Sequence, residues 1–278
     1  MVKLYKYSGA GNTFVVIDGR SEDASAFREP ARIKALCNRS SGFVSESETL
    51  SGKIVYGPGS DGLMILSDDP EYDFRMEFYN PDGSGGMMCG NGGRCIVAFA
   101  DALGIRPSGS GGEYLFAAPD GRHSARILQG GSRKIVELKM TDVADYHPVL
   151  DGWFVDTGTR HFVRFVEDAE AVNVEEEGRK ARWDEAFAPL GANVNFVSLR
   201  QDGTLLVRTF EKGVEAETLA CGTGITASAI AAYISGFAPA TSPGRYDVRA
   251  RIDNLSVDFR FEGGIFTDVY LTGPAEEI

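Results

Sequence analysis

The chain carries one short motif twice. Cys89 stands in M-C-G-N-G-G-R and Cys221 in A-C-G-T-G, so each cysteine precedes a glycine, one variable residue and a second glycine. The two cysteines are 132 residues apart in a chain of 278, and an apolar, alanine-containing segment follows each. A strand-like segment and a turn precede each, at 74–83 and 205–213. The order strand, turn, cysteine, helix therefore occurs twice, which predicts two similar domains that each supply one thiol.

Short runs of alternating apolar and polar residues are frequent elsewhere, for example at 74–78, 135–138, 205–210 and 257–261. Such runs, bounded by Gly, Asp and Pro, predict half-buried strands in mainly antiparallel sheets. Longer segments at about 24–37, 94–103 and 225–235 predict helices. The last two have no polar face, which is typical of a buried helix.

We therefore expect an α+β fold of two pseudo-symmetric domains, each a mainly antiparallel sheet wrapped around a buried central helix. The expected domains are residues 1–140, which carry Cys89, and residues 141–278, which carry Cys221. The C-terminal tail could return to the first half. In this arrangement the active site lies in the cleft between the two domains, with one thiol from each.

Composition narrows the class of protein and its partners. Apolar residues make up 43% and charged residues 24% of the chain, as in globular proteins. The net charge of −12 argues against nucleic-acid and anionic-membrane partners, because no basic surface is available to neutralise phosphates. No secretory signal and no apolar run of membrane-spanning length is evident. Four cysteines are too few for a disulfide framework. We expect a cytoplasmic protein with reduced thiols that acts on a small molecule.

The two cysteine motifs suggest proton-transfer chemistry. A cysteine at a helix N-terminus has a lowered pKa, and the glycines allow backbone N–H groups to point at an anion. Gly90, Asn91, Gly222 and Thr223 could hold a substrate carboxylate and stabilise the charge that develops when an α-proton leaves. One thiolate and one thiol on opposite faces of a carbon could then remove a proton and return one. Such a reaction requires no cofactor.

The other two cysteines are predicted to have structural roles, and motifs for metal or nucleotide binding are missing from the sequence. Cys37 and Cys95 fall within apolar helical patterns and are expected to be buried and unreactive. No C-x-x-C pair exists and His123, His147 and His161 are scattered, so we expect no metal site. The glycine clusters also lack the context of a phosphate-binding loop or a dinucleotide fingerprint.

Over nearly its whole length the chain resembles the diaminopimelate epimerase family. The matching segments are, in order, S-G-A-G-N-T-F at 8–14, G-S-D-G-L at 59–63, Y-N-P-D-G-S at 79–84, C-G-N-G at 89–92, A-N-V-N-F at 192–196, F-E-K-G-V-E at 210–215 and A-C-G-T-G at 220–224. Thr13 replaces an aspartate of the family pattern. The resemblance implies the family's fold and a cofactor-independent enzyme, a homodimer, that converts LL-diaminopimelate to the meso form in lysine and peptidoglycan precursor synthesis.

The resemblance also implies roles for matching residues. Cys89 and Cys221 would be the acid/base pair, with Cys221 the proton acceptor in the LL-to-meso direction. His161 and Glu211 would lie near the thiols and adjust their pKa values. The residues implied to contact the substrate are Asn12, Asn80, Asn193, Glu211 and Lys212, with Gly90, Asn91, Gly222 and Thr223 on the reacting carboxylate.

Three positions depart from the family pattern and bear on the distal end of the substrate. Thr159 stands where many members have a substrate-contacting Asn, Lys212 where many have Arg, and Gly62 where some have Gln. A racemase of another amino acid, such as proline, hydroxyproline or histidine, is therefore an alternative. An isomerase of the phenazine-biosynthesis type would lack the cysteine pair, and a non-catalytic binding protein would have no reason to keep both motifs.

Overall fold

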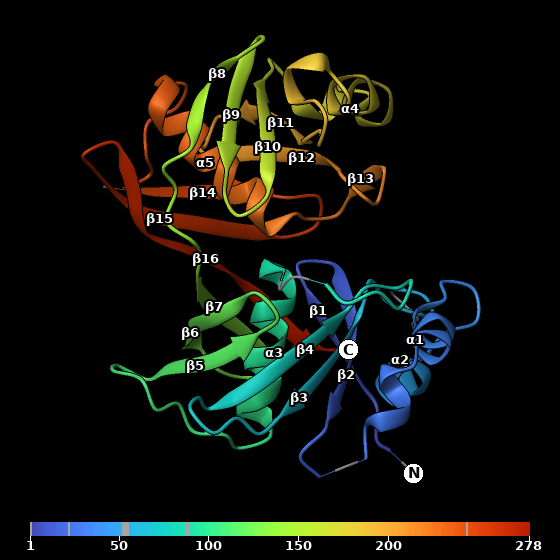
Figure 1. Cartoon of the computed structure of the whole chain (residues 1–278). Helices are drawn as coiled ribbons and strands as arrows, with labels where there is room; N and C mark the ends of the chain where they lie inside the picture. The colour runs from blue at the N-terminus through green and yellow to red at the C-terminus, as the bar shows by residue number, and fades with distance from the viewer. Residues whose placement is uncertain (1, 22, 52–55, 87–88, 243) are drawn as a thin grey trace. The chain divides into compact units, whose positions relative to one another are not determined.

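The structure is a computed structural model that describes residues 2–21, 23–51, 56–86, 89–242 and 244–278. The chain has a two-domain α+β fold and forms two compact units (Figure 1). Unit 1 contains Met1–Leu138 and Pro274–Ile278, and unit 2 contains Lys139–Gly273. The division into domains 1–140 and 141–278 remains a prediction. In the described part of the chain, no helix is long and apolar enough to cross a membrane.

Unit 1 is built mainly of strands. Its elements are β1 (Tyr5–Gly9), β2 (Asn12–Asp18), a 3-10 turn (Ser25–Arg28), α1 (Pro30–Cys37), α2 (Glu46–Ser51), β3 (Leu63–Ser67), β4 (Phe74–Tyr79), α3 (Gly90–Ala102), β5 (Glu113–Ala118), β6 (Gly121–Gln129) and β7 (Arg133–Lys139). The end of the last strand, β16 (Ile265–Glu277), also belongs to this unit.

Unit 2 has a similar content. Its elements are β8 (Tyr146–Val149), β9 (Gly152–Asp156), β10 (Arg160–Phe165), a 3-10 turn (Ala169–Ala171), α4 (Val174–Arg182), a 3-10 turn (Glu185–Phe187), β11 (Asn193–Leu199), β12 (Leu205–Glu211), β13 (Ala216–Thr218), α5 (Gly222–Ser235), β14 (Arg245–Arg249), β15 (Asn254–Glu262) and the first part of β16.

The strands of each unit pair in the same order of parallel and antiparallel neighbours. From β1 to β6, successive pairs are antiparallel, parallel, antiparallel, parallel and antiparallel. Strands β9, β10, β11, β12, β14 and β15 give the same series. An antiparallel strand precedes each series: the end of β16 pairs with β1, and β8 pairs with β9. The repeated cysteine motif is therefore part of a repeated topology.

The helices follow from this series because parallel neighbours need a crossover connection. In unit 1, α1 and α2 connect β2 to β3, and α3 connects β4 to β5; in unit 2, α4 connects β10 to β11, and α5 connects β12 to β14. Helix α3 packs on β1, β2, β3 and β6, and α5 packs on β9–β12, β14 and β15 (Figure 1). Both are largely buried, as expected, although α5 is exposed at its last turn. Helices α1 and α4 belong to separate apolar clusters with strands of their own unit.

The four strand segments expected from alternation all lie within observed strands, β4, β7, β12 and β15. The helix expected at 24–37 is wrong in part, because the chain forms a 3-10 turn and then α1. Proline locks its own backbone and disfavours a helical conformation in the residue before it, so Glu29 is extended and Pro30 begins the new helix. The two buried helices begin earlier than expected, directly after their cysteines.

Candidate active site

Cys89 is the N-cap residue of α3. Its backbone is extended, and its sulfur accepts a hydrogen bond from the backbone N–H of Gly92 at 3.2 Å. A sulfur in this position receives one of the N–H groups that have no partner within the helix, at the positive end of the helix dipole. A β-carbon at Gly92 would come within 3.2 Å of this sulfur and 3.3 Å of the Met64 sulfur. Glycine therefore keeps this turn close to the thiol.

A buried arginine holds the first turn of α3. Arg94 is fully buried, and its guanidinium donates to Asn91 Oδ1 at 2.8 Å and to the Gly90 carbonyl at 3.2 Å. Asn91 Nδ2 in turn donates to Asn12 Oδ1 at 2.6 Å. This series of contacts fixes two of the predicted substrate-contacting residues, Asn12 and Asn91, beside the helix end that carries Cys89.

Cys221 is the N-cap residue of α5 and has an extended backbone, like Cys89. Its sulfur lies 3.4 Å from the hydroxyl oxygen of Thr223. The Thr223 carbonyl accepts from the hydroxyl of Thr157 at 3.2 Å, which fixes the first turn of the helix. Gly222 and Thr223, predicted from the motif, thus lie directly beside the second thiol.

His161 lies on β10, fully buried, and both ring nitrogens have partners. Nε2 is 2.9 Å from Thr159 Oγ1 and 3.0 Å from Thr223 Oγ1, and Nδ1 is 3.0 Å from Asn195 Nδ2. The Thr223 hydroxyl therefore contacts both the His161 ring and the Cys221 sulfur. The last glycine of the motif makes room for the ring, because a β-carbon at Gly224 would lie 3.2 Å from His161 Cε1 and 2.3 Å from Asn195 Oδ1.

The remaining predicted residues lie at strand ends. Asn193 begins β11, and its side chain accepts from the Lys212 backbone N–H at 2.8 Å and donates to the Arg160 carbonyl at 3.1 Å. Glu211 ends β12 and is half-buried. Asn80 follows β4, and its Nδ2 donates to Ser84 Oγ at 3.0 Å. Asn80 and Asn193 thus each stabilise the loop beside their own strand, and their substrate contacts remain predictions.

Burial controls the charge of His161. It lowers the pKa of this imidazole from 6.5 to about 3. In the unfolded chain the ring takes up a proton as the pH falls below about 6.5. Between pH 6.5 and 3 the unfolded state therefore binds more protons, so this residue's contribution to the free energy of unfolding decreases as pH falls, by up to about 1.4 kcal/mol per pH unit.

Urea unfolding of the wild type and of His161→Gln at pH 7, 6 and 5 checks this expectation. Glutamine has no such proton linkage, so the stability advantage of the wild type should shrink as the pH decreases. A difference that stays constant over this range would contradict the neutral, buried state of His161.

The other two cysteines have structural surroundings. Cys95 is fully buried in α3 and Cys37 is buried at the end of α1, and burial raises the pKa of both thiols. A β-carbon at Gly9 would come within 2.9 Å of the Cys95 sulfur, so β1 packs closely on this part of α3. Among the described residues, no three His, Cys, Asp or Glu side chains are grouped in a way that could hold a metal ion.

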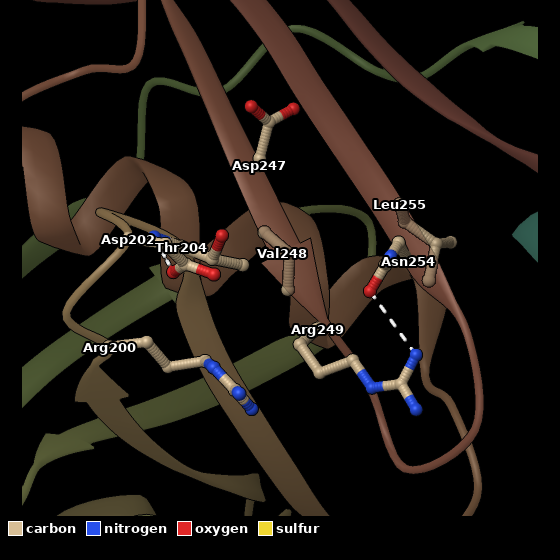
Figure 2. A pocket seen from close by; sticks show the side chains of 8 residues that line it. All are labelled: Arg200, Asp202, Thr204, Asp247, Val248, Arg249, Asn254 and Leu255. Atoms are coloured by element: carbon tan, nitrogen blue, oxygen red, sulfur yellow. Dashed lines mark hydrogen bonds between the residues drawn. The ribbon is translucent and has the colours of Figure 1, made fainter.

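A surface hollow of about 560 Å³ in unit 2 contains none of the predicted site residues (Figure 2). Its lining includes two arginines and two aspartates. Arg249 donates to Asn254 at 3.2 Å, and Asp202 accepts from the backbone N–H of Thr204 at 3.0 Å. The opposite charges offset one another, and we assign no ligand to this hollow.

Three residues around the second thiol were not identified from the sequence as part of the site. Asn195 contacts the His161 ring, Thr209 contacts Asn195, and Thr157 contacts the Thr223 carbonyl. The alternation in A-N-V-N-F was a usable signal for the first of these. Residues two apart on a strand share a face, so Asn195 points to the same side of β11 as the predicted Asn193. Thr209 lies opposite Asn195 on β12, a pairing that only the strand register reveals.

The sequence of the chain matches one protein family over most of its length. The family model "Diaminopimelate epimerase" matches residues 53–144 and 153–277. A diaminopimelate epimerase of Flavobacterium psychrophilum is 38% identical over 99% of this chain and 97% of its own length. One from Aquifex aeolicus is also 38% identical, over 100% of this chain and 96% of its own length.

Solved structures share the fold at low sequence identity. A Bacillus anthracis phenazine biosynthesis protein of the PhzF family aligns with a TM-score of 0.70 at 13% identity, over 100% of this chain and 97% of that chain. A hydroxyproline epimerase of Agrobacterium vitis, with bound trans-4-hydroxy-L-proline, aligns with a TM-score of 0.65 at 14% identity, over 99% and 90%.

Proposed function

Because this chain belongs to the diaminopimelate epimerase family, we propose that it converts LL-diaminopimelate to meso-diaminopimelate by proton transfer between two cysteines. The observation that carries the proposal is the repeated placement of a cysteine at the N-cap of a buried helix, Cys89 on α3 and Cys221 on α5. The reaction takes place without pyridoxal phosphate or any other cofactor.

In the LL-to-meso direction, Cys221 acts as the base and Cys89 as the acid. The Cys221 thiolate takes the α-proton from one face, and the Cys89 thiol delivers a proton to the other, so the C–H bond that breaks and the one that forms lie on opposite sides of the carbon. The helix N-terminus favours the thiolate at either cysteine. In the reverse direction the two residues exchange roles.

The charge on the intermediate is held by backbone N–H groups. Removal of the α-proton places negative charge on the substrate carboxylate, and N–H groups at a helix N-terminus stabilise such an anion. The groups that we assign to this task are those of Gly90, Asn91, Gly222 and Thr223, in the first turns of α3 and α5. Asn12, Asn80, Asn193, Glu211 and Lys212 complete the proposed substrate contacts.

The departures from the family pattern favour one alternative, a racemase of another amino acid. Lys212 offers a single ammonium in place of a guanidinium that binds in a bidentate manner. At Gly62 a β-carbon would lie 2.8 Å from the Tyr79 carbonyl and 3.1 Å from the Phe78 ring, so the structure excludes a longer side chain there without rearrangement. The substrate's distal end is therefore recognised differently from that in many relatives.

An assay of the reduced protein with LL-diaminopimelate, L-proline, trans-4-hydroxy-L-proline and L-histidine separates the two proposals. We expect meso-diaminopimelate to form and the other three amino acids to keep their configuration. Racemisation of one of these, with LL-diaminopimelate unchanged, would establish the alternative. We further propose a cytoplasmic homodimer that serves lysine and peptidoglycan precursor synthesis; sedimentation of the purified protein tests the oligomeric state.

A further inference from the structure

The side chains around His161 form one connected set of hydrogen bonds in unit 2. Asn195 contacts Nδ1 of the ring, the hydroxyls of Thr159 and Thr223 contact Nε2, and Thr223 contacts the sulfur of Cys221. We call these five residues the hydroxyl–imidazole chain. They come from the start of β10 and the residue before it, from β11, and from the start of α5 and its N-cap residue. Three separate segments of the fold therefore converge on one sulfur.

The direction of the hydrogen bonds at Asn195 can be assigned from its neighbours. One atom of its amide lies 3.2 Å from the Phe162 carbonyl, which can only accept, and the other lies 2.9 Å from the Thr209 hydroxyl. The atom that faces Phe162 must therefore be the NH₂ group, since a carbonyl oxygen there would face a second oxygen without a proton. The same NH₂ group faces Nδ1 of His161.

This assignment fixes the tautomer of the imidazole. Because Asn195 donates to Nδ1, that nitrogen carries no proton, and the proton of the neutral ring is on Nε2. Nε2–H then donates to a threonine hydroxyl. Thr159 Oγ1 lies 3.0 Å from Thr223 Oγ1, which lies 3.4 Å from the Cys221 sulfur. With Nε2 as a donor, the Thr159 hydroxyl can donate to Thr223, and the Thr223 hydroxyl can donate to the sulfur.

We propose that Asn195 is a positioning residue of the reaction. It holds His161 as the Nε2–H tautomer, so that the Thr159 hydroxyl donates to Thr223 and the Thr223 hydroxyl donates to the sulfur of Cys221. The opposite tautomer would present a lone pair at Nε2, which would compete with the sulfur for a hydroxyl proton. The hydroxyl–imidazole chain carries no formal positive charge and would stabilise a thiolate by hydrogen bonds alone. Hydrogen bonds in series strengthen one another.

Thr159 has a specific place in this proposal. It stands where many relatives have an asparagine, and it supplies a hydroxyl that contacts both the ring and Thr223. Thr159, which the sequence analysis connects with the distal end of the substrate, therefore acts on the thiol of Cys221. The inference rests on the proposed role of Cys221 as a base, but its tests use the protein alone, so they can fail independently of the substrate assignment.

The tautomer is measured directly by long-range ¹H–¹⁵N NMR of protein labelled with ¹⁵N-histidine. The chain has three histidines, and His161→Gln identifies the signals of His161. We expect a single neutral Nε2–H form at pH 7 in the wild type. In Asn195→Asp a carboxylate replaces the donor, so the ring proton should move to Nδ1. An Nδ1–H ring in the wild type would overturn the proposal. This result comes from the wild-type protein itself, and His161→Gln serves only to assign the signals.

The effect on the thiol is measured by the rate of iodoacetamide alkylation of Cys221 as a function of pH, in a Cys89→Ala background. Thr159→Val removes the intermediate hydroxyl without adding charge, and we expect a roughly twofold to threefold lower rate near pH 7 and a higher pH midpoint. Thr241→Val is the matched control, because it removes a hydroxyl that donates to the Arg245 carbonyl and contacts none of the five residues. Equal pH midpoints in the Thr159→Val variant and its parent would overturn the proposal.

Discussion

Cys221→Ala and Cys89→Ala should each lower kcat for epimerisation by roughly a thousandfold, because proton transfer by a positioned side chain contributes about 10²–10⁴-fold to the rate. Each variant keeps one of the two thiols. Cys89→Ala retains the base for LL-diaminopimelate, so it should exchange the α-hydrogen of that isomer with solvent without inverting it. Cys221→Ala should do the same for the inverted carbon of the meso isomer only.

Proton NMR in heavy water measures both exchange and inversion in these variants. Cys95→Ala is the matched control, since Cys95 lies on the same helix as Cys89, is fully buried, and has a thiol whose pKa burial raises. This control should retain epimerisation. If either active-site variant epimerised at the wild-type rate, or both exchanged the same isomer, the assignment of one base to each face would be wrong.

Lys6→Met should lower the free energy of unfolding by about 3–5 kcal/mol, because it leaves a buried carboxylate without its cation. Lys6 on β1 is fully buried, and its Nζ lies 3.0 Å from Glu48 Oε2 and 2.7 Å from the Gly57 carbonyl. Glu48 also accepts from the backbone N–H of Ser45, whose hydroxyl accepts from the Glu48 N–H. This capping box begins α2, so the ion pair connects α2 to the sheet of unit 1.

Urea unfolding of Lys6→Met and of the double variant Lys6→Met/Glu48→Gln measures this effect. The double variant removes both charges and should recover much of the lost stability, because a neutral amide is less costly to bury than an unpaired carboxylate. A single variant as stable as the wild type, or a double variant no more stable than the single, would show that the pair is not the main contribution.

The overall architecture could be predicted from the sequence because local residue patterns indicate most of its strands and its two buried helices. Alternation located strands such as β4, and the absence of a polar face identified α3 and α5 as buried helices. Local patterns were less informative about helices in segments made mainly of charged residues. Helix α4 has the sequence V-E-E-E-G-R-K-A-R, and its stability depends on an asparagine cap and on Gly178, which packs against the Phe210 side chain.

The composition of the site was only partly predictable. The cysteine motifs identified the helix N-termini and their glycines, since those features are contiguous in the chain. The partners of His161 are not contiguous. Pairing of β10 with β11 brings Asn195 to the ring, and pairing of β11 with β12 brings Thr209 to Asn195. Strand register, which could not be inferred from local sequence patterns, brings these residues together. The same holds for Arg94, whose buried contacts with Asn91 could not be inferred from a helical pattern alone.

The isotope content of both isomers at low conversion in heavy water tests the central claim, two bases acting on one carbon, most directly. LL-diaminopimelate is incubated with the reduced wild-type protein, the reaction is stopped early, and deuterium at the α-carbons is measured in product and recovered substrate. We predict that the meso product carries one solvent deuterium at the inverted carbon, while the recovered LL isomer keeps its original hydrogen. A product that retains the substrate's own hydrogen, or equal deuterium in both isomers, would contradict proton transfer by two separate cysteines.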